Sequence, residues 1–104
     1  MTDQYSNKIT AIIPTYNEAS NLSKLVDQLF ELNLPNFDIL IIDDNSPDKT
    51  AKVAENLSSQ YGGKIEIIVR PQKAGLGTAY KQGFAHAVKS GSKHLIQLDA
   101  DLSH

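Results

Sequence analysis

The sequence predicts one α/β domain in which a parallel sheet lies between helices on both of its faces. The chain has 104 residues, the size of one domain, and its 40% hydrophobic and 21% charged residues are typical of a globular protein. Short apolar runs alternate with longer stretches of helical periodicity, in the order strand, helix, strand, helix, strand, helix, strand. That order is typical of right-handed crossovers, so the predicted fold class is α/β with a three-layer parallel sheet.

The first half of the chain supplies two strands and one helix. The first strand is expected over residues 8–13, and Pro14 is expected to end it. A helix follows from Asn17 or Ser20 to Leu32, and its apolar positions recur at the spacing of one helix face. These positions are Leu22, Leu25, Val26, Leu29 and Phe30. The nearly continuous apolar run over residues 37–42 is typical of a strand covered on both faces.

The second half repeats the alternation. Ser46 and Pro47 read as an N-cap and a first helical residue, and this helix is expected to end before Gly62. Its buried stripe is Val53, Ala54 and Leu57. A strand over residues 65–69, a helix from Gly77 or Thr78 to Lys89 and a strand over residues 94–98 complete the order. The apolar positions of that last helix are Tyr80, Phe84, Ala87 and Val88.

Chemically unusual side chains follow every predicted strand. The four segments are residues 14–18, 43–48, 70–77 and 99–101. Because the carboxyl ends of parallel strands meet at one edge of the sheet, and ligands bind there where the strand order reverses, we expect the segments to form one site.

The last of these segments, Asp99-Ala100-Asp101, predicts a metal site. Two carboxylates one residue apart can face one hard cation, and Mg²⁺ or Mn²⁺ is usually held by one or two carboxylates plus water and substrate phosphates. The alternative is an aspartate that caps a helix or forms a turn. The position directly after an apolar strand favours the metal.

Two further segments carry candidate nucleotide contacts, each with a local alternative. Asp43 and Asp44 end a buried strand, which is costly unless a group such as a base amide or ribose hydroxyl binds them, although their sequence also suits a turn and a helix start. The Tyr16 ring suits stacking beside a base, or it packs against the protein. The Glu18 carboxylate suits sugar hydroxyls, or it favours a helix N-terminus.

The loop after the third strand combines cations and glycines. Arg70 and Lys73 would face the carboxylates and suit phosphate, and a solvated loop is the alternative. Gly75 and Gly77 permit a close backbone approach or a left-handed turn. We therefore expect this loop on the phosphate side of the site.

Composition and missing motifs exclude several classes. The net charge of −2 and the scattered basic residues argue against nucleic-acid binding, and without cysteine there is no disulfide framework or thiolate zinc site. No G-x-x-x-x-G-K-[ST] motif occurs, which excludes the P-loop NTPases. The turn after the first strand has no glycine, which excludes the nicotinamide-dependent enzymes with a dinucleotide fingerprint. The N-terminus lacks the apolar stretch of a signal peptide. We expect a cytoplasmic protein, at most peripheral at the cytoplasmic membrane face, and not secreted.

Together the four segments resemble the nucleotide-sugar-binding half of the family-2 glycosyltransferases, most closely the dolichyl or polyprenyl phosphate mannosyltransferases. The matching strings are PTYNE with NL at residues 14–18 and 21–22, IIDDNSPD at 41–48, GLGTAY with GF at 75–80 and 83–84, and DADLSH at 99–104. Two positions depart from the family pattern. Lys49 stands where relatives commonly have glycine, and Ser103 where some place a glutamine metal ligand.

The resemblance implies a nucleotide-diphospho-sugar transferase fold of the A type, with Mg²⁺ or Mn²⁺ as cofactor. The implied nucleoside contacts are Pro14, Tyr16 and Glu18, and the implied base contacts are Ile42 and Asp44. Asp99, Ala100 and Asp101 would meet the diphosphate, with Asp99 and Asp101 as catalytic residues and metal ligands, and Lys73 joins them as a phosphate contact. The domain would occupy residues 8–104 after a tail over residues 1–7, and we expect it to be truncated because the metal motif stands at its end.

The implied reaction is transfer of a hexose, expected to be mannose from GDP-mannose, to polyprenyl or dolichyl phosphate with inversion. Expected partners are the nucleotide sugar, the lipid phosphate, and a second copy of the chain or a C-terminal remainder of the enzyme. Two alternatives stay open: a family-2 transferase that uses a UDP-sugar, and a non-catalytic module that binds nucleotide sugar and metal. A receiver-type regulatory domain fits poorly, because its paired acids should follow the first strand, where Pro14-Thr15-Tyr16 stands.

Overall fold

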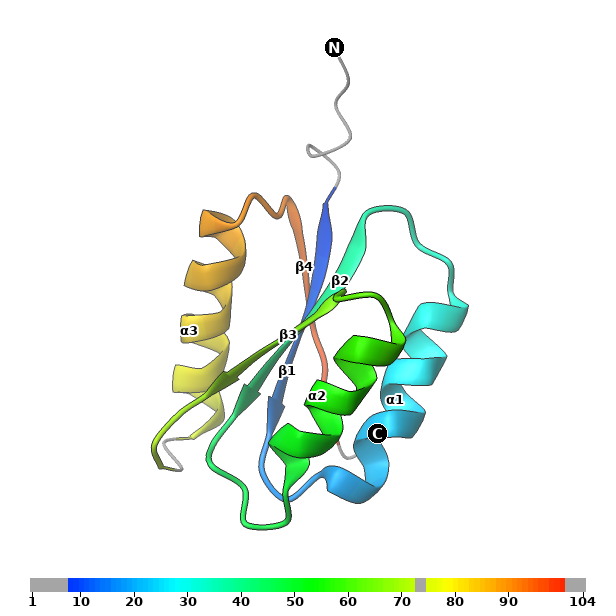
Figure 1. Ribbon diagram of the computed structural model, residues 1–104. Coiled ribbons are helices and arrows are strands. Elements are labelled where there is room, and N and C mark those ends of the chain that lie inside the picture. Colours follow the sequence, from blue (N-terminus) through cyan, green and yellow to red (C-terminus); the bar gives the residue numbers. More distant parts are fainter. Residues whose placement is uncertain (1–7, 73–74, 101–104) are drawn as a thin grey trace.

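A computed structural model describes residues 8–72 and 75–100, and its centre is a sheet of parallel strands (Figure 1). The strands are β1 (Ile9–Thr15), β2 (Phe37–Asp43), β3 (Ile65–Val69) and β4 (His94–Gln97). Their order across the sheet is β3-β2-β1-β4, and every neighbouring pair is parallel. The predicted parallel α/β sheet is therefore confirmed.

Helices cover both faces of the sheet, as the three-layer prediction requires. Helices α1 (Ala19–Glu31) and α2 (Thr50–Gln60) lie on one face, and α3 (Leu76–Lys89) lies on the other (Figure 1). Each face has its own core, one built with Leu22, Val26 and Leu57, the other with Ala79 and Ala87 of α3. Within the ranges that the structure describes, no helix is long and apolar enough to cross a membrane.

Strand β1 continues through Pro14, so the prediction that this proline ends the strand is wrong. Pro14 pairs with Ile42 of β2, and Thr15 pairs with Asp43. The nitrogen of Pro14 faces away from β2. Residues two apart on a strand face the same neighbour, and the carbonyl of Ile12 accepts from the N–H of Leu98, just after β4, so the Pro14 nitrogen also faces that side. The ladder between β1 and β4 ends at Ile12, so the proline removes only the hydrogen bond that would come next.

Helix α2 begins at Thr50, and the prediction of a start at Ser46 and Pro47 is wrong. The preceding residue, Lys49, has a φ of 66°, in the left-handed region, so the chain cannot run as a helix through it. Ser46 instead bonds with both its N–H and its hydroxyl to the Asp43 carboxylate, which closes a turn directly after β2.

Helix α3 packs so closely on β1 that glycine is needed at the contact. A Cβ on Gly83 would lie 2.6 Å from Cγ2 of Ile12, which is fully buried. Val88, which was expected on the apolar face, is 61% exposed. Ala87 is buried and Tyr80 and Phe84 pack against the same core, as predicted. Ala79 and Gly83 are buried beside them, and these small residues let the helix approach the strands.

Candidate functional site

The four polar segments do converge at the carboxyl edge of the sheet. The Asp44 N–H donates to the Thr15 carbonyl at 3.1 Å, and the Arg70 N–H donates to the Asp43 carbonyl at 2.7 Å. The segment after β4 joins them through the N–H of Leu98, 3.2 Å from the Ile12 carbonyl. The strand order reverses between β1, which is followed by β2 and β3 on one side, and β4 on the other. Parallel α/β sheets bind ligands at such a reversal.

Asp43 is a structural residue that holds the turn after β2. Its carboxylate is 1% exposed and accepts from the hydroxyl of Thr15 at 2.6 Å and from the hydroxyl of Ser46 at 2.6 Å. The N–H of Ser46 donates to its second oxygen at 2.9 Å. For this aspartate the turn alternative is the correct one, because its carboxylate binds the N–H and the hydroxyl of Ser46, three residues later.

Asp44 has a different partner, a buried guanidinium. Nε of Arg70 lies 2.5 Å from Oδ1 of Asp44, and Nη2 lies 2.8 Å from Oδ2, so the pair is bidentate. Both side chains are less than one-tenth exposed. Such paired hydrogen bonds fix the plane of the carboxylate as well as its charge.

The same guanidinium ties the site to the start of α3. Its Nη1 donates to the hydroxyl of Thr78 at 2.9 Å, and Nη2 donates to the carbonyl of Gly75 at 3.2 Å. The expectation that Arg70 faces the carboxylates is confirmed, whereas the solvated-loop alternative is wrong for this residue. The register of the sheet could have revealed its partner, because Val69 pairs with Asp43 and the next residues on each strand are Arg70 and Asp44.

The loop after β1 presents Tyr16 at the edge and fixes the backbone beneath it. Tyr16 is 37% exposed, while Pro14 before it is buried. Asn17 has a φ of 58°, a region that asparagine tolerates, and its N–H donates to the Ser46 hydroxyl at 2.9 Å. The N–H of Glu18, a half-buried residue, donates to the hydroxyl of Thr50 at 3.0 Å. The first two loops therefore form one connected unit.

Asp48 joins the starts of two helices, a role that the sequence did not suggest. Its Oδ2 accepts from the N–H of Ala19 in α1 at 3.1 Å, and its Oδ1 accepts from the N–H of Thr50 in α2 at 3.1 Å. Burial raises the pKa of Asp48, but the hydrogen bonds from the Thr50 hydroxyl and these N–H groups outweigh it, so the pKa lies below its usual value.

Asp99 lies exposed just beyond β4 and shares a hydrogen bond with α3. The hydroxyl of Tyr80 is 3.1 Å from Oδ1 of Asp99 and 3.4 Å from the Leu98 carbonyl. Burial of the ring, reinforced by the bond to Asp99, raises the pKa of Tyr80. Ala100 turns inward and is 4% exposed, packed in the core beneath α1 and α2.

The remaining predicted contacts divide into one buried residue and two outside the described ranges. The side chain of Ile42 is fully buried, so only its backbone can reach a ligand. Lys73 and Asp101 lie outside the described residues. Within residues 8–72 and 75–100, no three His, Cys, Asp or Glu side chains are grouped to hold a metal. A cation at Asp99 would therefore need further oxygen ligands. Water and phosphate supply such ligands to Mg²⁺ and Mn²⁺ when a protein offers only one or two carboxylates.

The comparison with family models identifies the chain. The model described as glycosyl transferase family 2 matches residues 10–104. This chain belongs to that family. Two solved structures share its fold: the mannosyltransferase PcManGT from Pyrobaculum calidifontis, in complex with GDP-Man and Mn²⁺, and TarS from S. aureus, each with a TM-score of 0.72. The chain is 23% identical to the first over 77% of its length and 21% identical to the second over 90%.

Two curated relatives have names that refer to mannose and to polyprenol or dolichol. The chain is 38% identical to a polyprenol monophosphomannose synthase of Mycolicibacterium smegmatis over 95% of its length, and 41% identical to a dolichol-phosphate mannosyltransferase of Pyrococcus furiosus over 93%. It spans only 37% and 26% of those two proteins, and 24% and 16% of the two solved chains. The predicted family and the A-type glycosyltransferase fold are thus confirmed.

Proposed function

We propose that this glycosyltransferase-family chain binds a nucleotide sugar and a divalent cation for the inverting transfer of mannose from GDP-mannose to a polyprenyl phosphate. The observation that carries the proposal is the placement of Asp44 and Asp99 just after β2 and β4, the two strands that flank β1, at the reversal of strand order. The names of the two curated relatives support mannose and a polyprenol acceptor, and the solved mannosyltransferase complex supports GDP-Man and Mn²⁺.

In this proposal the loops after β1 and β2 hold the nucleoside. Tyr16 offers an exposed aromatic face for a base, and Glu18 offers a carboxylate for the sugar hydroxyls. Pro14 and the backbone of Ile42 form the floor, since both side chains are buried. Asp44 accepts from the base amide, with its orientation set by the bidentate pair with Arg70.

The segment after β4 holds the diphosphate side. Asp99 and Asp101 are the proposed catalytic residues and ligands of Mg²⁺ or Mn²⁺, with Ala100 setting their spacing and Lys73 as a phosphate contact. The exposed, hydrogen-bonded carboxylate of Asp99 suits a hard cation, whose chemistry there is to offset the charge of the leaving diphosphate. Helices α1, α2 and α3 all begin at this edge, and helix N-termini favour anions (Figure 1).

The acceptor explains why the site needs no strong general base. A lipid phosphate is already an anion near neutral pH, so its oxygen attacks the sugar carbon without losing a proton, unlike a hydroxyl acceptor. We place the reaction at the cytoplasmic face of a membrane, where the chain would act with a further part of the enzyme or with a second copy of itself.

Calorimetry tests this proposal. The chain is titrated with GDP, GDP-mannose, UDP and UDP-glucose, each with and without Mn²⁺. We expect GDP ligands to bind more tightly with Mn²⁺, and Asp99→Asn to lose at least tenfold of that affinity. Asp38→Asn is the matched control, because it makes the same change at the opposite edge, where Asp38 bonds to Thr10 at 2.6 Å.

The outcomes separate the alternatives. Metal-dependent binding of UDP ligands in place of GDP ligands would replace the proposed donor with a UDP-sugar. An unchanged affinity of Asp99→Asn for GDP ligands with Mn²⁺, or equal losses of affinity in both variants, would contradict the assignment of Asp99 to the binding site.

A further inference from the structure

A gap in the backbone ladder between β1 and β4 lies directly beside Asp99. In this ladder the Leu98 N–H donates to the Ile12 carbonyl, and in regular parallel pairing the N–H of residue 14 would next donate to the Leu98 carbonyl. Residue 14 is proline and has no N–H to donate. The carbonyl of Leu98, just after β4, therefore cannot receive this ladder bond.

Tyr80 of α3 supplies a donor to this carbonyl instead. Its hydroxyl lies 3.4 Å from the Leu98 carbonyl and 3.1 Å from Oδ1 of Asp99, so one proton is shared between the strand end and the carboxylate. The ring belongs to the core between α3 and the sheet, and it contacts Phe84 with ring centres 6.3 Å apart. The hydroxyl is thus held by a packed ring on a helix rather than by a surface side chain.

We propose that Tyr80 is a positioning residue for Asp99, and this inference rests on the proposed function. Its hydroxyl fixes one carboxylate oxygen of Asp99 against the end of β4, and this limits the orientations in which the carboxylate can meet a divalent cation. Hydrogen bonds to ligating carboxylates typically change metal affinity 10-fold to 100-fold when they are removed. The role needs only the hydroxyl, because the ring already serves the core.

The hydroxyl alone can be removed with Tyr80→Phe, and the chain contains a matched control. Tyr61 also has a packed ring and bonds through its hydroxyl to an aspartate, Asp27 of α1, but it lies at the C-terminal end of α2, away from the carboxyl edge. Tyr61→Phe therefore deletes the same group from the same kind of pair. The affinity for GDP is measured by calorimetry for both variants, with Mn²⁺ and without metal, after thermal unfolding has checked that each is folded.

We expect Tyr80→Phe to weaken GDP binding 10-fold to 100-fold with Mn²⁺ and to leave metal-free GDP binding unchanged. Tyr61→Phe should match the unchanged chain in both conditions. A loss in Tyr80→Phe that is equal with and without Mn²⁺ would show a general structural role and overturn the inference, as would no loss at all. If the unchanged chain shows no Mn²⁺-dependent GDP binding, the proposed function itself fails, and the inference with it.

Discussion

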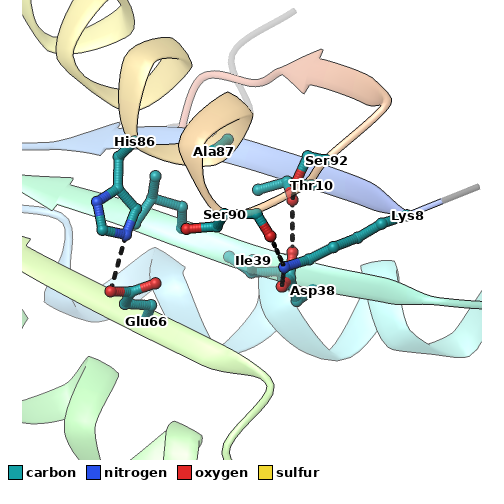
Figure 2. Close-up of a pocket in the computed structure, with 10 residues that line it drawn as sticks. Lys8, Thr10, Asp38, Ile39, Glu66, His86, Ala87, Ser90 and Ser92 are labelled. Atoms are coloured by element: carbon teal, nitrogen blue, oxygen red, sulfur yellow. Dashed lines mark hydrogen bonds and ion pairs between the residues drawn. The ribbon is translucent and has the colours of Figure 1, made fainter. Parts of the chain in front are cut away.

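The two edges of the sheet use similar polar side chains in opposite ways. At the amino edge, shown in Figure 2, Thr10 donates to Asp38, Ser92 bonds to Thr10, and Lys8 reaches both Asp38 and the Ser90 carbonyl. These groups bond to each other around a cavity of about 20 Å³, which has room for about one water molecule. At the carboxyl edge the polar groups form a buried inner layer and an exposed outer layer, and only the groups of the inner layer bond to neighbouring protein segments in this way.

The inner layer of the carboxyl edge supports an outer one. Asp43 and the pair of Asp44 with Arg70 are buried and bonded to neighbouring segments, whereas Tyr16 and Asp99 above them are exposed. The strand direction explains the difference, because all three helices begin at the carboxyl edge and helix N-termini favour anions there. The comparison teaches that the carboxyl edge differs from the amino edge in presenting exposed side chains, Tyr16 and Asp99, beside a buried polar cluster.

Breaking the inner layer should have the largest effect. Arg70→Ala leaves the buried Asp44 carboxylate without its guanidinium, and we expect the free energy of unfolding to fall by about 3–5 kcal/mol. Lys8→Ala removes the cation of the amino edge, whose ion pair with Asp38 is 25% and 33% exposed, and should cost less than about 1 kcal/mol. Urea unfolding measures both. Equal losses would show that the two edges do not differ in this respect.

Thr10→Val separates stability from binding at the amino edge. Thr10 is 4% exposed and its hydroxyl bonds both Asp38 and Ser92, so its loss should lower the free energy of unfolding by about 1–3 kcal/mol. Because these groups serve only each other, the affinity for GDP with Mn²⁺ should not change in calorimetry. Weaker nucleotide binding in the folded variant would show that the amino edge influences the site.

The smallest expected effect is a gain in stability at the entrance to α2. Lys49 has left-handed backbone, which costs a side-chain-bearing residue about 1–2 kcal/mol, whereas glycine adopts it freely but loses about 0.5–1 kcal/mol more chain entropy. Lys49→Gly should therefore stabilise the chain by about 0.5–1 kcal/mol in urea unfolding. Lys52→Gly, inside the same helix, is the control and should destabilise it by about 1 kcal/mol. A loss in both variants would contradict this account of Lys49.

Most of the fold follows from patterns that can be read along the chain. Apolar runs mark β2 and β3, and a regular apolar face marks α1, because burial on one or two faces imposes those spacings. The convergence of the polar segments was also predictable, since parallel strands end at one edge. The errors arose at Pro14, where pairing with the distant strand β2 outweighed the preference for ending a strand, and at Ser46, where bonds to the Asp43 carboxylate close a turn in place of a helix start.

The partners within the site were harder to predict because they depend on side-chain direction in space. Arg70 was expected to suit phosphate, but its guanidinium turns back to Asp44, twenty-six positions earlier. Tyr80 was predicted only as part of the apolar face of a helix, and that face does bury its ring. No local pattern reveals that its hydroxyl extends past the core to Asp99.

Paramagnetic NMR tests the central claim, that ligand binding belongs to the carboxyl edge, most directly. Amide resonances of the chain are recorded with GDP and Mn²⁺, and with GDP and diamagnetic Mg²⁺ as the reference. The account predicts that Mn²⁺ broadens the amides near Asp99 and Tyr16 most strongly and those of Thr10 and Ser92 least. Strongest broadening at Thr10 and Ser92, or uniform broadening over both edges, would contradict it.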